Sequence, residues 1–331
     1  MGGGFAMPTV HLMAGIPGSG KSFFAKKLAV SNQAVYISSD DIRKQWYGNA
    51  GIQGDNSRIF DAIRRMIRNH LADGSDVVFD ATNLSRRKRI HFTRNDVRGF
   101  PVVAHVLCTP YHTCLLRNQQ RGRKVDEQVL NRMYKQFELP FSEEGFYRVA
   151  YYTPDLSLDC VHKQDVKRIM GEAVSYQDFF RVLNHFPGFP EIYELPHDSR
   201  LHHLSVSRHS YYLHQEVLHH YHSPAKEKLL WLSMLHDLGK GICKSFLHFK
   251  GVKRKYAHFD GHENVSAYLA IQLLKSLDYS HDFVHSTAKL ISLHMLESET
   301  SKKRRKNANK LLHPEEKQIL DHFTILNHQL R

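Results

Sequence analysis

A glycine-rich stretch near the start of the chain carries the residues best suited to chemistry. Residues 15–22 read GIPGSGKS and fit the pattern G-x-x-x-x-G-K-[ST], in which backbone N–H groups surround phosphate oxygens. The lysine of this pattern reaches the β- and γ-phosphates, and the hydroxyl after it binds Mg²⁺, which makes Ser22 the expected Mg²⁺ ligand. The pattern therefore predicts a site for ATP or another nucleoside triphosphate, formed by Gly15, Pro17, Gly18, Ser19, Gly20, Lys21 and Ser22.

A second group of polar residues follows the next apolar run. Residues 38–43 read SSDDIR, and Asp40 could accept a proton from a hydroxyl acceptor while Arg43 holds a phosphate of that acceptor. Alternatively, Ser39 and Asp40 cap a helix, a position that both residue types favour. The residues by themselves leave both interpretations open.

Two later segments could assist phosphoryl transfer. A third apolar run ends near Asp80 and Thr82, either of which could orient metal-bound water or the acceptor. Arg117 and Arg121 stand four residues apart in LLRNQQRG, so we expect them on one helix face, from which they could clamp a triphosphate. Residues 85–89, SRRKR, either contact nucleic-acid phosphates or form a solvated face.

The second half of the chain holds a different constellation, rich in histidine. Residues 166–331 contain nineteen of the 25 histidines. His236 and Asp237 end the apolar run WLSMLHDLGK, His209 precedes them, and His262 and His294 follow. A neighbouring histidine and aspartate can bind one metal ion or bridge two. The order H…HD…HE…H within a helical segment therefore predicts a metal centre.

The elements that position these residues differ between the two halves. The first half alternates strands and helices, which predicts a parallel sheet with helices on both faces, whereas from about Tyr176 the pattern is helical only. We place the domain boundary between about 165 and 185, which gives domains at 1–170 and 171–331. The expected strands are Val10–Ala14, Val35–Ser38, Val77–Phe79, Val102–Leu107 and Val149–Tyr152.

The composition of the chain indicates which class of partner and which compartment to expect. The chain has 331 residues and a net charge of +13, with a pI near 9.5, which favours a polyanionic partner such as nucleic acid or an anionic membrane surface. Its four cysteines form no C-x-x-C pair, which favours a reduced, cytoplasmic setting. No apolar run reaches the length of a membrane span, and the N-terminus lacks a signal peptide.

The first group of motifs resembles the kinase domain of phage-type polynucleotide 5′-kinases. The resemblance rests on GIPGSGKS, SSDDIR, DATNL, LLRNQQRG and KVDEQVLNRMYKQFELP, in this order, over residues 8–155. It implies that Asp40 is the general base on the 5′-hydroxyl, that Arg43 contacts the acceptor's 3′-side phosphate, and that Arg121 stabilises the transferring group with support from Arg117. The phage enzymes read D-T-N where this chain has residues 81–83, ATN, so Asp80 could take over the acidic role.

The second group resembles the HD phosphohydrolase superfamily over residues 176–331, and is most similar to the HD modules of CCA-adding enzymes through HDLGK and HFDGHENV. The resemblance implies that His209, His236 and Asp237 bind a first divalent metal, such as Mn, Ni, Co or Zn. His262 and His294 would bind a second metal or the substrate phosphate, which Lys240 would neutralise. The superfamily's last metal ligand is an aspartate in a later helix. Asp321 and Asn327 are the two candidates for this position, and we favour Asp321.

Together the two resemblances imply a P-loop kinase domain followed by an all-α HD domain, as in bacterial enzymes that heal RNA ends. The kinase would phosphorylate 5′-OH ends, and the HD domain would remove 2′,3′-cyclic phosphate or 2′-phosphate from 3′ ends. The expected partners are RNA or DNA ends, cleaved tRNA among them, and an RNA ligase, with no membrane. One alternative is a nucleotide or small-metabolite kinase with a nucleotide-hydrolysing HD domain, and another is a nucleotide sensor without turnover.

Overall fold

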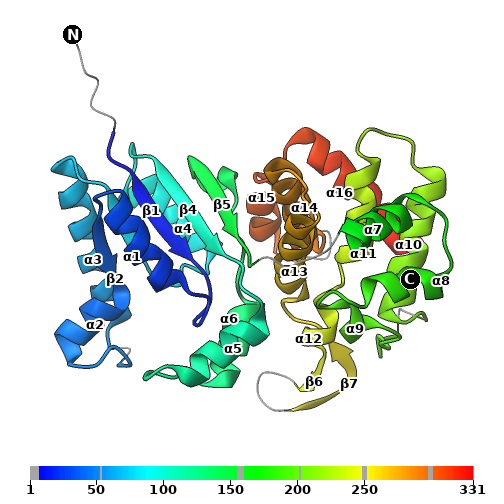
Figure 1. Ribbon diagram of the computed structural model, residues 1–331, viewed down its shortest axis with the longest axis horizontal. Coiled ribbons are helices and arrows are strands. Elements are labelled where there is room, and N and C mark those ends of the chain that lie inside the picture. The colour runs from blue at the N-terminus through cyan, green and yellow to red at the C-terminus, as the bar shows by residue number, and fades with distance from the viewer. Residues whose placement is uncertain are drawn as a thin grey trace, which may run out of the picture. The chain divides into compact units, whose positions relative to one another are not determined.

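The chain forms two compact units in a computed structural model (Figure 1), which describes residues 7–52, 54–154, 160–200, 203–247, 252–296 and 301–330. Unit 1 is Met1–Pro154 and unit 2 is Asp155–Arg331. The division lies earlier than the boundary expected near residue 170. The reason is helix α7 (Cys160–Gly171), which packs on helix α8 (Tyr176–Leu183) and accepts a hydrogen bond from His214 at the Met170 carbonyl.

Unit 1 is built on a five-stranded parallel sheet, which confirms the expected architecture. The strand order is β2-β3-β1-β4-β5, so the strand that leads into the glycine-rich loop lies at the centre. A central parallel strand is covered on both faces, and this explains why Val10, Leu12, Met13 and Ala14 of β1 are apolar and buried. The strands are β1 (Val10–Ala14), β2 (Val35–Ser38), β3 (Val77–Asp80), β4 (Val102–Leu107) and β5 (Arg148–Tyr152).

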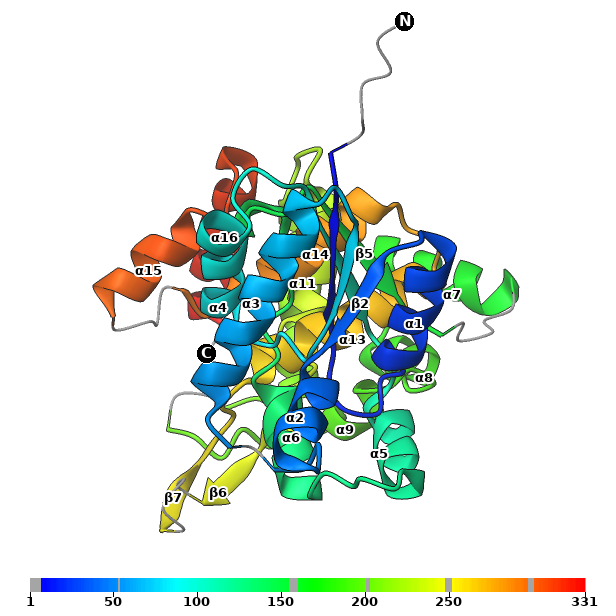
Figure 2. The same cartoon turned by 90° about the vertical axis from the view of Figure 1, so that its left-hand side faces the viewer.

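Helices cover both faces of this sheet (Figure 2). Helix α1 (Lys21–Ser31) buries Ala25 and Ala29 against one face, where Met13 and Val78 point. Helices α3 (Asn56–Ala72) and α4 (Arg86–His91) cover the other face. The remaining elements are α2 (Ser39–Tyr47), α5 (Tyr111–Gln120), α6 (Glu127–Lys135), a π-helical turn at Phe92–Asp96 and a 3₁₀ turn at Ser142–Glu144.

Unit 2 is mainly a helical bundle around α11 (Lys226–Leu235), whose residues from Leu229 to Leu235 are all buried. The expectation of an all-helical unit is wrong at one place, because Ser245–Leu247 (β6) and Lys253–His258 (β7) form an antiparallel hairpin. The other helices are α9 (Phe189–Ile192), α10 (Val206–His220), α12 (Lys240–Cys243), α13 (His262–Ser276), α14 (His281–Leu293), α15 (Lys302–Asn309) and α16 (Pro314–Gln329).

None of the helices within the described ranges combines the length and apolar character needed to cross a bilayer. The three cysteines whose side chains are described, Cys108, Cys114 and Cys243, are buried free thiols.

A pair of histidines, one buried and one half-buried, should make the free energy of unfolding of unit 1 depend on pH. His11 Nδ1 lies 3.0 Å from His105 Nε2, and His105 Nδ1 lies 2.9 Å from the Tyr152 hydroxyl. Burial, and next the charge of His11, lowers the pKa of His105 from 6.5 to about 3, and burial also lowers the pKa of His11. Both histidines are therefore neutral in the folded protein at neutral pH.

We expect unit 1 to keep its full stability above pH 6.5 and to lose stability as the pH falls toward 3, because the unfolded chain then binds protons that the folded protein excludes. One such histidine changes the free energy of unfolding by about 1.4 kcal/mol per pH unit in this range. His105→Phe should flatten this slope, whereas His112→Phe, at an exposed position, should not. Denaturant unfolding at several pH values, followed by Trp46 fluorescence in a Trp231→Phe background, would measure this pH dependence. Equal slopes for the two variants would show that His105 is not its source.

Candidate functional site

The glycine-rich loop has a backbone that only glycine permits at two positions. Gly18 has φ +82°, and a Cβ there would lie 2.2 Å from the carbonyl oxygen of Cys114. Gly20 has φ +89° and is the N-cap residue of α1, so no side chain caps that helix. The loop is anchored by hydrogen bonds from the Gly15 N–H to the Thr82 carbonyl and from the Thr109 hydroxyl to the Ser19 carbonyl. The N-terminus of α1 is therefore open to an anion.

The side chains around this loop fit Mg²⁺ and a triphosphate. Ser19 Oγ and Asp80 Oδ1 are buried and have no hydrogen-bond partner within the described part of the chain, although Asp80 Oδ2 accepts from the Tyr36 hydroxyl at 2.8 Å. Burial lowers the pKa of Lys21, an effect that Asp80 opposes and Arg121 reinforces. Bound phosphates would supply the negative charge that Lys21 needs, and Ser22 lies beside it in the first turn of α1.

Asp40 lies in a cluster of cationic groups after β2. Its Oδ1 is 3.2 Å from Arg43 Nη1 and 2.8 Å from Arg123 Nη1, and its side chain is 46% exposed, so an acceptor can reach it. The capping interpretation of Ser39 and Asp40 is wrong, because Ser38 caps α2 by accepting from the N–H groups of Asp40 and Asp41. The carboxylate of Asp40 is thus left available for chemistry.

Arg43 and Arg123 hold this carboxylate in place. Arg43 is buried, and its Nη2 donates to Asn56 Oδ1 at 2.8 Å while its Nη1 donates to the Ser39 carbonyl at 3.3 Å. No sequence motif identifies Arg123 or Asn56. The sequence RGRK after the helix was the available signal for Arg123, because it places a second arginine two residues after Arg121.

Arg117 and Arg121 do not share a helix face, contrary to expectation. Helix α5 ends at Gln120, and Arg121 has an extended backbone, with φ −78° and ψ 148°. Arg117 still reaches the glycine-rich loop, because its Nη1 lies 3.5 Å from where a Cβ on Gly20 would be. The segment after α5 is tied down by buried Asn118, whose amide group exchanges hydrogen bonds with both backbone groups of Val125. Both arginines remain exposed at this edge.

The basic run at 85–89 is partly structural. Arg89 is 1% exposed and makes two hydrogen bonds to the carboxylate of Glu144, at 2.8 and 2.9 Å. It also donates to the carbonyls of Asn83 and Leu84, and thereby fixes the loop that follows β3. Arg89 therefore contacts neither nucleic acid nor solvent.

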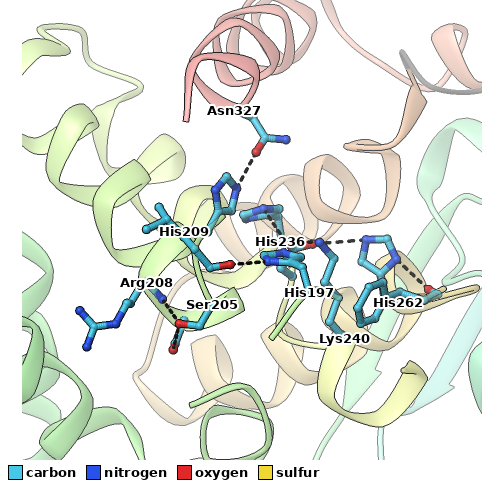
Figure 3. Close-up of polar contacts among 12 residues, drawn as sticks. His197, Ser205, Arg208, His209, His236, Lys240, His262 and Asn327 are labelled. Atoms are coloured by element: carbon cyan, nitrogen blue, oxygen red, sulfur yellow. Dashed lines mark hydrogen bonds and ion pairs between the residues drawn. The ribbon is translucent and has the colours of Figure 1, made fainter. Parts of the chain in front are cut away.

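Unit 2 brings histidines from separate segments together, and Figure 3 shows His209, His236 and His262 among them. Asp237 follows the buried helix α11, and its Oδ2 lies 3.1 Å from His236 Nε2, with Oδ1 3.4 Å from His262 Nε2 and 4.0 Å from His294 Nε2. Two groups of potential metal ligands share this aspartate: His209, His236 and Asp237, and Asp237, His262 and His294. All five residues are buried.

The protonation states suit a metal ion. Burial, together with the charge of His236, lowers the pKa of His209 to about 4, and burial with the charge of His262 holds the pKa of His294 well below its usual range. Although burial acts to raise the pKa of Asp237, His236 and Lys240 hold it well below its usual range. His209 and His294 are therefore neutral imidazoles and Asp237 is a carboxylate at neutral pH, which are the forms that bind metals.

Lys240 and His197 complete the lining of a cavity of about 440 Å³ at this cluster. Lys240 Nζ lies 2.7 Å from Asp237 Oδ2 and rests over the ring of Phe259. His197, which belongs to no sequence motif, is 2% exposed. Its Nε2 lies 3.9 Å from Asp237 Oδ2, and its Nδ1 lies 2.9 Å from the Leu204 carbonyl oxygen. Its sequence context, LPHDS, shows no pattern that would have identified it.

The preference for Asp321 as the last ligand is wrong. Asp321 is exposed on α16, whereas Asn327 lines the cavity and its Oδ1 lies 2.8 Å from His209 Nε2. Helix α16 buries Ile319, Leu320 and Phe323, and this register turns Asp321 to solvent. An amide oxygen, not a carboxylate, therefore lies beside His209 in this cavity.

We expect Asn327→Asp to raise the affinity of the cluster for Mn²⁺ or Zn²⁺ by about 10-fold or more, because a carboxylate beside His209 adds a full negative charge to the ligand set. Asp321→Asn should leave the affinity unchanged. Competition with a chelating dye would measure both values. An equal affinity for Asn327→Asp and the wild type would show that residue 327 does not face the metal.

Comparisons with known proteins cover part of the chain. Residues 10–140 match the family model described as AAA domain. An L-seryl-tRNA(Sec) kinase of Methanococcus maripaludis is 25% identical over 175 residues, which are 50% of this chain and 65% of that enzyme. The transcription factor bHLH140 of Arabidopsis thaliana is 31% identical over 165 residues, which are 46% of this chain and 17% of the plant protein. The chain thus spans less than two thirds of each of these relatives.

Among solved structures, a chain of the Pnkp1/Rnl/Hen1 RNA repair complex is 21% identical with a TM-score of 0.38, covering 41% of this chain and 45% of that one. A sugar kinase from Janibacter is 17% identical with a TM-score of 0.34, covering 45% of this chain and 86% of that one. The family match falls entirely within unit 1. Unit 1 is therefore a P-loop domain with the fold of P-loop kinases, in a chain whose remainder is largely helical.

Proposed function

We propose that the chain is a bifunctional enzyme that heals broken RNA ends. Unit 1 transfers the γ-phosphoryl group of ATP to a 5′-hydroxyl, and the metal cluster of unit 2 removes 2′,3′-cyclic phosphate or 2′-phosphate from 3′ ends. The observation that carries the kinase half is the half-exposed carboxylate of Asp40, held by Arg43 and Arg123 at the edge of the sheet where the glycine-rich loop lies.

The residues of unit 1 divide the work of phosphoryl transfer. Lys21 and the N–H groups at the start of α1 hold the phosphates, and Arg121 and Arg117 neutralise charge on the transferring group. Ser22 and Asp80 are placed to hold Mg²⁺ and its water, and the bound ion would offset charge on the phosphates. Asp40 accepts the proton of the attacking hydroxyl, and Arg43 and Arg123 keep its carboxylate oriented.

RNA as the acceptor is supported by the charge of +13 and by the name of one relative, a kinase of L-seryl-tRNA. An acceptor on RNA carries a phosphate close to the reacting hydroxyl, and the buried guanidinium of Arg43 beside Asp40 suits such a group. The alternative acceptor is a free nucleotide or a small metabolite.

In unit 2, Asp237 would hold a divalent metal together with either of two histidine pairs, His209 with His236 and His262 with His294. The metal would supply Lewis-acid polarisation of the phosphate ester. Lys240 and His197 line the same cavity and would hold the anionic oxygens of the substrate. The products of the two units, a 5′-phosphate and a 3′-hydroxyl end, are those that an RNA ligase joins, so we propose an RNA ligase as the functional partner.

The kinase half is tested with γ-labelled ATP and three acceptors: a 5′-OH RNA oligonucleotide, the same oligonucleotide with a 5′-phosphate, and a nucleoside 5′-monophosphate, which has no free 5′-hydroxyl. We expect label only on the 5′-OH RNA. Label on the monophosphate alone would favour the metabolite kinase, and no label on any acceptor would remove the kinase assignment. For unit 2, a 2′,3′-cyclic-phosphate oligonucleotide is incubated with Mn²⁺ or Ni²⁺, and an unchanged end would remove the hydrolase assignment.

A further inference from the structure

Helix α3 has an arginine face that the catalytic groups do not use. Its isoleucines Ile59, Ile63 and Ile67 are spaced four residues apart and are fully buried against the sheet. Arg65 and Arg68 lie on the opposite, exposed side of the helix. The core therefore fixes the direction in which these arginines point.

A hollow of about 420 Å³ lies on this face. It is bounded on one side by α3 and on the other by the end of α4 and the π-helical turn Phe92–Asp96. Such turns are rare and often mark functional sites. The lining residues are Asp61, Arg64, Arg65, Arg68, His91 and Asp96.

The charges of this hollow do not cancel. Arg64 forms ion pairs with Asp61 and Asp96, and His91 Nε2 lies 3.8 Å from Asp96. Within the described part of the chain, neither Arg65 nor Arg68 forms an ion pair. Arg64 pairs with both carboxylates, the three arginines of the hollow outnumber its two aspartates, and the guanidinium groups of Arg65 and Arg68 remain for an anionic ligand.

Helix α3 extends from the acceptor site at its first residue to the hollow further along. Asn56, the first residue of this helix, accepts a hydrogen bond from Arg43 of the Asp40 cluster. At 1.5 Å per residue, Arg65 and Arg68 lie about 14 to 18 Å along the helix from Asn56. With a rise of ~3.4 Å per nucleotide, a stacked strand covers that distance in about four to five nucleotides.

We propose that the arginine face of α3, defined by Arg65 and Arg68, binds backbone phosphates of the RNA whose 5′ end lies at Asp40. This inference rests on the proposed function and adds a second contact, several nucleotides behind the reacting end. Guanidinium groups bind phosphate oxygens without reading the bases, so the contact is independent of sequence. It favours RNA long enough to reach the hollow over a short oligonucleotide.

The test compares wild type with the double variant Arg65→Gln/Arg68→Gln on a 20-nucleotide and a 3-nucleotide 5′-OH RNA. We expect KM for the long RNA to rise by about 10-fold, with kcat and the KM for the short RNA unchanged. Anisotropy titrations of labelled long RNA between 50 and 200 mM salt should show a slope of log K against log salt that is smaller by about 1.4, because two single-strand phosphate contacts are lost. Lys26→Gln/Lys27→Gln, on α1 at the other face of the sheet, should change none of these values.

Equal KM for the long RNA in wild type and variant, or an equal rise for both RNAs, would overturn the proposal. Unchanged RNA binding together with lost binding of poly-glutamate would assign the surface to an acidic protein and would also overturn it. If the wild type phosphorylates neither RNA, the kinase assignment fails, and the anisotropy slope alone then decides whether this surface binds RNA.

Discussion

Asp40→Asn is expected to lower the rate of phosphoryl transfer to a 5′-OH RNA by about 10² to 10⁴-fold, the usual contribution of a general base. The amide keeps the size of the side chain and can still accept hydrogen bonds from Arg43 and Arg123, so the geometry is retained while the proton acceptor is lost. Transfer of label from γ-labelled ATP measures the effect under single-turnover conditions.

Asp41→Asn is the matched control for this experiment. Asp41 is the next residue of the same helix, is exposed, and shares with Asp40 the role of donating its N–H to Ser38. Its substitution changes the net charge equally but should leave the rate near that of the wild type. Equal losses in the two variants would mean that local charge, not proton transfer, is responsible. ATP binding should be unchanged in both.

Asp237→Asn is expected to empty the metal cluster of unit 2 and to reduce phosphoester hydrolysis by more than about 100-fold, because even residues that only support metal ligands contribute 10- to 100-fold. Asp237 is the residue that the two ligand groups of this cluster share, so its loss affects both groups. Metal content by mass spectrometry and hydrolysis of a 2′,3′-cyclic-phosphate oligonucleotide are measured on the same preparation.

The control for the cluster is Asp260→Asn. Asp260 lines the same cavity but its side chain is 88% exposed and pairs with His258 at the surface. It should retain both metal and activity. Full metal content in Asp237→Asn would show that the histidines alone hold the ion, and retained hydrolysis without metal would remove the metal mechanism. Thermal melting of both variants checks that unit 2 stays folded, since Lys240 loses its buried ion pair in Asp237→Asn.

The architecture of unit 1 could be predicted because its signals are local. Short apolar runs alternating with amphipathic helices gave strand positions within one residue of those observed, and a parallel sheet follows from that alternation. In unit 2 the apolar helices were equally clear, but the β6–β7 hairpin was missed. Its residues are mostly polar and half exposed, so no apolar period marks it.

The residues of the candidate sites also fall into two groups, those that a local sequence pattern identifies and those that depend on contacts between distant segments. The phosphate-binding loop was readable from GIPGSGKS because its function depends on the backbone of eight consecutive residues, and Gly18 and Gly20 adopt the conformations that this motif requires. The pairing of His236 with Asp237 was also local. By contrast, the role of Arg89 was misjudged, because its partner Glu144 comes from a distant turn that only the folded chain brings next to it.

The sequence by itself therefore determined a parallel P-loop domain, its phosphate-binding loop, and a helical half with candidate metal ligands. Only the tertiary structure decided which residues complete each site. Arg123 reaches Asp40 across a loop, His197 approaches Asp237 from a separate segment, and the register of α16 selects Asn327 over Asp321. These contacts depend on side-chain packing between elements far apart in the chain, and the spacing of residues within one element carries no information about such packing.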